Sequence, residues 1–429
     1  MGLKRGRGLT PANEGGGGPL APLTQPTYRR LLLSNALWWQ TYAIWVIVAG
    51  VVVLDMTNSA LAVTLLTFWR RAAQLLFGGF AGIVGDRLGR RNTLVLSQFV
   101  IFLSCLALLL LFAGNRLSAW QIGAAAFIIG ASWTVDAPAR AALVPDLLGA
   151  GLTADAMLLE SFMHSLMNSI AAYLAGWLLQ LYGTAGGLGA LIVLTALNLA
   201  ILAWLGRAKV PQTISVAATS VWRSMGEGFT YIRAHRPLLV VAVVSALLNT
   251  FVFPALSLMP VFARDVFASG VLGLGLMNAS YGLGTFAGLY LTHRMRGRLT
   301  FSAIFAAGAV LQCTAWGVFA LSPLFSLAVA LLFLAGAGQA GFYTMRNVIL
   351  LTGASNEMRG RAMSTVALTQ GIGLPGEILS GSLSESIGPR ITVAAQAGLT
   401  ALASLIVAAS GGRQRKNSRR VPDSDPQSH

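Results

Sequence analysis

The stretch of sequence that decides the fold reads Gly82-Ile83-Val84-Gly85-Asp86-Arg87-Leu88-Gly89-Arg90-Arg91. It is a short charged segment between two long apolar runs. Glycine at 82 permits close approach of a neighbouring helix, and glycine at 89 permits a tight turn. Asp86 stands at a helix end among arginines, so we expect it to be ionised and paired. The stretch predicts a structured loop between two membrane helices.

The composition around this loop is that of a membrane protein. Of the 429 residues 55% are hydrophobic and only 10% are charged, with a mean hydropathy of +0.69, whereas a soluble domain carries roughly 25% charged residues. The two cysteines and four histidines show no ligand or disulfide spacing, so no metal and no cofactor are expected. No phosphate-binding Gly-x-x-x-x-Gly-Lys loop and no nucleophile–base set are visible, which argues against ATP hydrolysis and against an enzyme.

Apolar runs of about 20 residues predict twelve membrane helices. They lie at 31–54, 60–85, 93–113, 119–142, 155–182, 186–206, 237–262, 271–292, 301–321, 323–346, 361–384 and 388–409. The longest internal hydrophilic stretch, 207–236, divides them into six plus six, as an internal duplication predicts. The expected fold class is therefore an all-α polytopic membrane protein with two pseudo-symmetric six-helix bundles.

The same pattern divides the chain into five parts. They are a disordered cytoplasmic N-tail (1–28), an N-terminal bundle (29–206), a cytoplasmic linker (207–236), a C-terminal bundle (237–410) and a basic disordered C-tail (411–429). In the linker, Val221, Trp222, Met225, Phe229 and Ile232 fall on one helical face. This predicts either an amphipathic helix at the inner membrane interface or a linker helix packed on the bundle.

The charges fix the orientation. The formal net charge is +16, but the basic residues stand in short clusters between apolar runs, which argues against a nucleic-acid partner. With both termini cytoplasmic, 25 of the 30 lysines and arginines fall on the cytoplasmic side and three fall outside. We therefore expect a multi-pass protein of the cytoplasmic (inner) membrane, surrounded by lipid.

These features resemble the major facilitator superfamily over essentially the whole chain, and the opening stretch resembles its motif A. The resemblance implies a cytoplasmic gate in which the aspartate faces the start of the eleventh helix and an arginine pairs with an acid at the inner end of the fourth. Carried onto this chain, Asp86 faces Arg359 and Arg361, and Arg90 pairs with Asp136 when the cavity opens outward. The alternative is that the gate charges only fix topology, but a lone acid such as Asp136 inside a span is costly without a partner.

Two further stretches resemble the efflux branch of transmembrane secretion effectors, which includes siderophore and macrolide exporters. They are Asp136-Ala-Pro138-Ala-Arg140-Ala-Ala-Leu-Val-Pro145-Asp146 and Gly226-Glu-Gly-Phe-Thr-Tyr-Ile-Arg-Ala-His-Arg-Pro237. The chain also departs from the family. Ala125-Ala126 replaces an arginine common in proton-coupled members, Ala171-Ala172 replaces the Gly-Pro of many antiporters, and the loop 293–298 lacks the acid of motif A.

Charged residues within the spans are the candidates for a transport cavity, because each costs several kcal/mol (roughly 2.5–3.5) near the bilayer centre. Arg70 and Arg71 cannot point the same way on a helix, so one of them faces the cavity or the domain interface and could attract an anionic substrate group. The alternative is a structural pair with an acid of the eleventh helix. Glu377 is either that partner or a proton carrier.

A second candidate for proton handling is the pair Glu160 and His164, which share a helix face at i and i+4. The alternative is that Glu160 is solvated at the cytoplasmic interface. Other candidate cavity residues are polar or aromatic: Asn35, Trp39, Gln40, Trp133, Asn249, Tyr343 and Gln370. The segment Gly371, Gly373, Pro375, Gly376 is expected to let the eleventh helix bend.

The sequence therefore predicts a secondary transporter that works by alternating access, with proton-coupled efflux of a small amphipathic molecule such as a drug, siderophore or secondary metabolite. Its expected partners are that small molecule and protons, and the expected functional unit is a monomer. One alternative is an uptake symporter for a small anion or nutrient. Another is a membrane scaffold or receptor that transports nothing.

Overall fold

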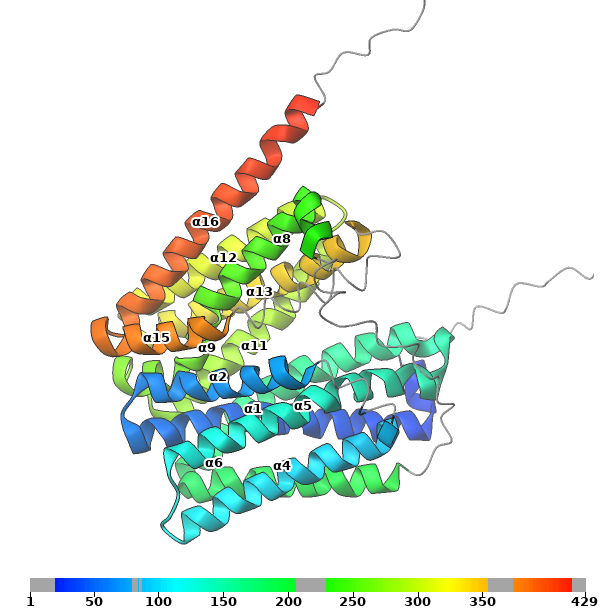
Figure 1. Ribbon diagram of the computed structural model, residues 1–429, viewed down its shortest axis with the longest axis vertical. Helices are drawn as coiled ribbons and strands as arrows, with labels where there is room; N and C mark the ends of the chain where they lie inside the picture. The colour runs from blue at the N-terminus through cyan, green and yellow to red at the C-terminus, as the bar shows by residue number, and fades with distance from the viewer. Residues whose placement is uncertain (1–19, 79–83, 85–86, 206–228, 354–372, 419–429) are drawn as a thin grey trace, which may run out of the picture.

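The computed structural model describes residues 20–78, 84, 87–205, 229–353 and 373–418, and every regular element in these ranges is a helix (Figure 1). Eight of the described helices are long and apolar enough to cross a membrane. A continuous apolar helix satisfies its own backbone hydrogen bonds, which is why apolar runs of this length adopt no other structure in lipid. The all-helical membrane fold predicted from the sequence is confirmed.

The first half of the chain forms η1 (Ala21–Thr24), α1 (Pro26–Thr57), α2 (Ala60–Phe77), α4 (Arg90–Ala113), α5 (Ala119–Leu148) and α6 (Ala150–Trp204). Polar caps mark the helix starts. Ser59 accepts from the backbone N–H of Ala62 at the start of α2, and Ser118 forms a capping box with Gln121 before α5. Gly183, with φ of 59° and ψ of −155°, divides α6 into two membrane-crossing legs.

The second half forms α8 (Arg236–Leu247), η3 (Leu248–Val252), α9 (Pro254–Ser257), α10 (Met259–Val261), η4 (Phe262–Val266), α11 (Gly270–Met295), α12 (Phe301–Leu321), α13 (Phe325–Gly353), α15 (Leu374–Ile387) and α16 (Pro389–Ser418). The elements from α8 to η4 make one interrupted crossing, where the sequence predicted a single span. Pro254 and Pro260 each remove a backbone donor there, and η3 and η4 are π-helical turns. Such turns are frequent at functional sites.

Both expected tails are partly helical, which corrects the sequence prediction. Tyr28 is fully buried in α1, and its hydroxyl donates to the carbonyl oxygen of Ala156 at 3.2 Å. The helix begins before the apolar run because the fixed φ of Pro26 suits a first helical position. At the other end α16 continues to Ser418, since 413–416 are good helix formers. Most of the predicted linker helix lies outside the described residues.

The two halves meet where α15 lies beside α2 and where α11 lies beside α6. Glycines bring the backbones together in the second contact: a Cβ added to Gly275 would lie 2.8 Å from the carbonyl oxygen of Ala172. We call the end of the bundle that carries Asn58 and Arg264 the closed end, and the opposite end, where α6 ends and α8 begins, the linker end. The closed end is on the left in Figure 1.

Candidate functional site

A buried ion pair joins the two halves. Nη2 of Arg71 on α2 lies 3.5 Å from Oε1 of Glu377 on α15, and the Glu377 side chain is fully buried. The sequence left two roles open for Glu377, and the structure brings it to an arginine of the second span. Separating such a pair inside a membrane leaves a buried charge without a partner, so the pair holds α2 against α15 while both residues are charged.

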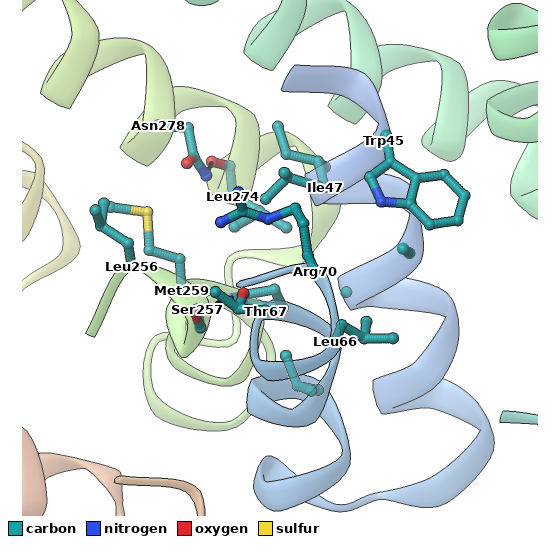
Figure 2. Close-up of a pocket in the computed structure, with 15 residues that line it drawn as sticks. Trp45, Ile47, Leu66, Thr67, Arg70, Leu256, Ser257, Met259, Leu274 and Asn278 are labelled. Atoms are coloured by element: carbon teal, nitrogen blue, oxygen red, sulfur yellow. Dashed lines mark hydrogen bonds between the residues drawn. The ribbon is translucent and has the colours of Figure 1, made fainter. Parts of the chain in front are cut away.

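Arg70 is not part of that ion pair, because an adjacent position lies about 100° further round the helix. It lines a narrow crevice between the halves, with walls that include Trp45, Leu256, Met259 and Leu274 (Figure 2). In Figure 2 its guanidinium reaches from α2 toward the α11 side of the crevice. The two adjacent arginines therefore separate into one that links the halves and one that faces a space between them.

Aromatic rings continue from the crevice into the first half. The Arg70 Cζ lies 5.6 Å from the ring centre of Tyr42, which lies 4.6 Å from the ring of Trp133 and 6.4 Å from that of Trp39. The Trp39 ring in turn lies 3.8 Å from that of His164. The row connects the predicted cavity residues Trp133 and His164 through α1. Gln40 is half-buried on the same helix.

Asp136 is buried in a hydrogen-bond network, and both of its carboxylate oxygens accept hydrogen bonds, but Arg90 is not among the donors. Arg140 donates to it at 2.7 Å from the same helix, Ser97 donates at 2.7 Å, and Gln98 donates at 2.5 Å. The predicted pairing of Arg90 with Asp136 concerns the outward-open arrangement and stays a prediction, because this structure is closed at the end that carries Asn58 and Arg264. Arg90 binds Asp146 and donates to the carbonyl oxygen of Ala142 at 2.9 Å.

Arg90 meets Asp146 here because of the level at which α4 and α5 lie side by side. Arg90 is the first residue of α4, and it lies level with the end of α5 that carries Asp146. Residues 97 and 98, about two turns further along α4, lie level with Asp136. The sequence does indicate the pairing of Asp136 with Arg140, because the two residues stand at i and i+4 on one helix face.

Glu160 belongs to the edge of the same network. It accepts a hydrogen bond from Asn35 Nδ2 at 2.8 Å, and Asn35 Oδ1 accepts from Arg140 at 2.8 Å. His164, one turn along α6, packs on the Trp39 ring. The two residues share a face as predicted, but each is held by α1. No group of three His, Cys, Asp or Glu side chains that could hold a metal occurs in the described ranges.

The opening loop of the sequence is only partly described. Gly89 has a φ of +79° and immediately precedes α4, as a tight turn requires. Arg91 donates to the carbonyl oxygens of Leu202 and Ala203 at 3.2 and 3.1 Å, and Arg87 is exposed. The remaining predicted gate residues, and one predicted bending residue, lie outside the described residues: Gly82, Asp86, Arg359, Arg361 and Gly371.

The glycines of the eleventh helix serve close approach. A Cβ on Gly373 would lie 2.6 Å from the carbonyl oxygen of Asn249, and one on Gly376 would meet the carbonyl oxygen of Thr250. Both carbonyls belong to the π-helical turn η3, and Pro375 stands in the first turn of α15. Asn249 itself is buried and donates to the carbonyl oxygen of Ser245 at 2.8 Å, so it packs inside the second half.

The contacts at the closed end were missed from the sequence. Arg264 lies 3.7 Å from Asp55 and donates to Leu54 O and Asn58 Oδ1, each at 3.0 Å. Across the same end, Glu385 accepts from the Ser59 hydroxyl and from the Leu61 N–H, the latter at 3.2 Å. Each contact joins the first half to the second. They are short loop-end interactions between residues far apart in the chain, which no local pattern announces.

Comparisons with known proteins give the geometry a context. A family model described as transmembrane secretion effector matches residues 17–425. A search of curated proteins found no significant match. The structure is similar to that of the nucleoside transporter NupG, with a TM-score of 0.71 and 15% identity over 91% of this chain and 99% of that one.

Two other solved transporters have a similar structure. A D-xylose-proton symporter has a TM-score of 0.68 and 13% identity, covering 88% of this chain and 96% of its own. A bacterial homologue of the human lysosomal transporter Spinster, in an inward-facing conformation, has a TM-score of 0.66 and 16% identity, covering 90% and 96%. At these identities the likeness concerns the fold.

Proposed function

The chain belongs to the transmembrane secretion effector family of major facilitator transporters, and from this premise we propose that it exports a small amphipathic molecule in exchange for protons. As a member of that family it is a secondary transporter with a multi-pass membrane fold, and not an enzyme. The direction of transport, the coupling ion and the residues that bind cargo and protons are therefore proposed below.

In alternating access, the two six-helix halves rock against each other around a central site. The basic residues between the spans assign the linker end to the cytoplasm. The closed end then faces outward and is sealed by Arg264 and Glu385, so the crevice would open toward the cytoplasm when the halves rock apart at the linker end. Cargo loaded from inside would leave once the closed-end contacts break.

The observation that carries the proton step is the Arg71–Glu377 pair beside the crevice. The charged groups facing Glu377 are Arg71 and Arg70, both on α2. When Glu377 takes up a proton it loses its charge, and its attraction to Arg71 falls, so α15 is freed from α2. Deprotonation restores the pair and the closed arrangement. One proton thereby changes the contact between the two halves.

The first prediction tests this step in proteoliposomes that hold the purified full chain, a pH-sensitive dye and one probe at a time: ethidium, erythromycin, desferrioxamine B or the aromatic carboxylate 2-naphthoate. Export should be driven by an imposed pH gradient, with protons moving opposite to the probe. The Glu377→Gln variant should lose proton movement but keep probe exchange at equilibrium, because a neutral amide imitates the permanently protonated carboxyl. Asp155→Asn is the matched control, since Asp155 forms no ion pair with the described residues.

Each alternative gives a different result. Probe and protons moving in the same direction would indicate an uptake symporter, and movement of neither would favour a scaffold or receptor. Normal coupling in Glu377→Gln would exclude this residue as the obligatory carrier. Transport that ignores the pH gradient would remove proton exchange altogether.

A further inference from the structure

The crevice beside Arg70 is built from both halves. Its lining residues come from α1, α2, the interrupted crossing α9–α10, and α11. Apolar side chains make most of the wall, and Arg70 is the only charged residue among the described residues that line it (Figure 2). Apolar walls with a small number of polar groups are typical of sites for small amphipathic molecules.

Arg70 has no ion-pair partner of its own among the described residues. Arg71 has Glu377 as its partner, whereas Arg70 forms no ion pair or hydrogen bond within the described ranges. The two arginines and one acid therefore leave one positive charge at the interface between the halves. A free cation inside a membrane costs several kcal/mol (roughly 2.5–3.5), so its retention beside a crevice points to an anion that binds there.

The polar neighbours of Arg70 are already engaged. Ser257 donates to Thr67 at 2.9 Å, and Asn278 Nδ2 donates to the carbonyl oxygen of Leu274 at 3.0 Å. Arg70 thus supplies the largest set of spare donors at this site, and the only charged ones among the described lining residues. Its guanidinium is planar and carries five N–H groups in a fixed fork, which matches the two oxygens of a carboxylate.

The backbone of Arg70 is held in place by a close helix contact. A Cβ on Gly130 of α5 would lie 2.8 Å from the Arg70 carbonyl oxygen, so α5 packs directly against α2 at this point. The Tyr42 ring lies on another side of the guanidinium. The cation is therefore positioned by the first half while it faces residues of the second.

We propose that the crevice binds an amphipathic carboxylate, with the carboxylate on Arg70 and the apolar part against Trp45, Leu256 and Met259. The inference rests on the proposed function, since it names the class of cargo that the same site takes. Arg70 is the anion-binding residue and Arg71 is the link between the halves. Of these two adjacent residues, Arg70 thus recognises the cargo and Arg71 couples transport to protonation of Glu377.

The second prediction tests this site by calorimetric titration of the full chain in lipid nanodiscs. The probes are 2-naphthoate and its neutral counterpart 2-naphthamide. Arg70→Gln should weaken naphthoate binding about tenfold or more, because a charge-assisted pair is lost, while Arg70→Lys restores part of it. The amide should bind at least about tenfold more weakly than naphthoate to the unchanged protein. Arg298→Gln, which removes an exposed arginine elsewhere, should bind as the unchanged protein does.

A thermal unfolding scan of each variant establishes that it is folded. Equal naphthoate affinity in Arg70→Gln, equal affinity for the amide, or no saturable binding to the unchanged protein would each overturn the inference. Export from proteoliposomes separates the two proposals. Naphthoate that binds through Arg70 but is not exported would reject export and leave the anion site, whereas export unaffected by Arg70→Gln would reject the anion site alone.

Discussion

The two halves place an arginine at the same point of their fourth membrane-crossing helix. Arg140 is the 22nd residue of α5, and Arg346 is the 22nd residue of α13. The register is supported by a glycine at the twelfth residue of each helix. Gly130 packs on the backbone of Arg70 in α2, and Gly336 packs on the backbone of Tyr281 in α11, the second crossing of its half. The two arginines are thus structurally equivalent.

Their surroundings differ. Arg140 is 4% exposed and donates to Asp136, Ser34 and Asn35. Four residues before Arg346 stands Phe342 in place of an acid, and no described carboxylate lies within ion-pair distance of Arg346. Its Cζ lies 4.3 Å from the Tyr343 ring centre, and Nη1 is buried with no hydrogen-bond partner within the described ranges. It is only 8% exposed.

The difference shows which half is stabilised by buried polar contacts at this point. The network around Arg140 reaches α1, α4 and α6 from α5, because Asn198 of α6 accepts from Ser34 and donates to Gln98. It therefore makes the first half resist internal rearrangement. At the same point the second half relies on ring contacts of Phe342 with Phe253 and Phe305. Among the described residues, no ionic network occupies this point of the second half.

The largest effect should come from breaking the network of the first half. Arg140→Met should lower the free energy of unfolding by about 3–5 kcal/mol, because it leaves the buried Asp136 without its counter-charge. The measurement is unfolding of the detergent-solubilised full chain by SDS titration. Asp136→Leu added to Arg140→Met should recover most of the loss, since replacing a whole buried pair by apolar groups is often neutral. A double variant as unstable as the single one would show that the hydrogen bonds matter more than the charges.

Much of the fold is readable from the sequence, because lipid demands apolar runs of fixed length and helical backbone. The link between Arg71 and Glu377 was among the alternatives, since two opposite charges inside spans need a partner. The pairing of Arg90 with Asp146 in this structure was not predicted, because the level at which two helices lie side by side is set by packing. The contacts of Arg264 and Glu385 also depend on how the two halves pack, which the spacing of residues along the sequence does not indicate.

A smaller effect should test the equivalence of the two fourth helices. Gly130→Ala and Gly336→Ala should each lower the free energy of unfolding by about 1–3 kcal/mol, because the added Cβ meets backbone atoms that cannot yield without moving a helix. Gly398→Ala in α16 is the control, since its Cβ would meet nothing within 4 Å; it should be neutral or stabilise by up to about 1 kcal/mol. If only one of the two fourth-helix variants loses stability, the halves do not share this packing register.

The smallest effect is expected at Arg346, and it decides what the comparison means. Arg346→Met removes a buried cation that has no acidic partner among the described residues, so no buried acid loses its counter-charge, although the 3.3 Å hydrogen bond to Asn347 Oδ1 is lost. The methionine can still pack on Tyr343 and Phe342, and the free energy of unfolding should change by less than about 1 kcal/mol in either direction. When both variants are measured in the same SDS titration, Arg346→Met should change the free energy of unfolding much less than Arg140→Met, although the two positions are equivalent. A loss at Arg346 as large as that at Arg140 would mean that the second half also depends on its buried charge, and the ring contacts would then be insufficient to explain its stability.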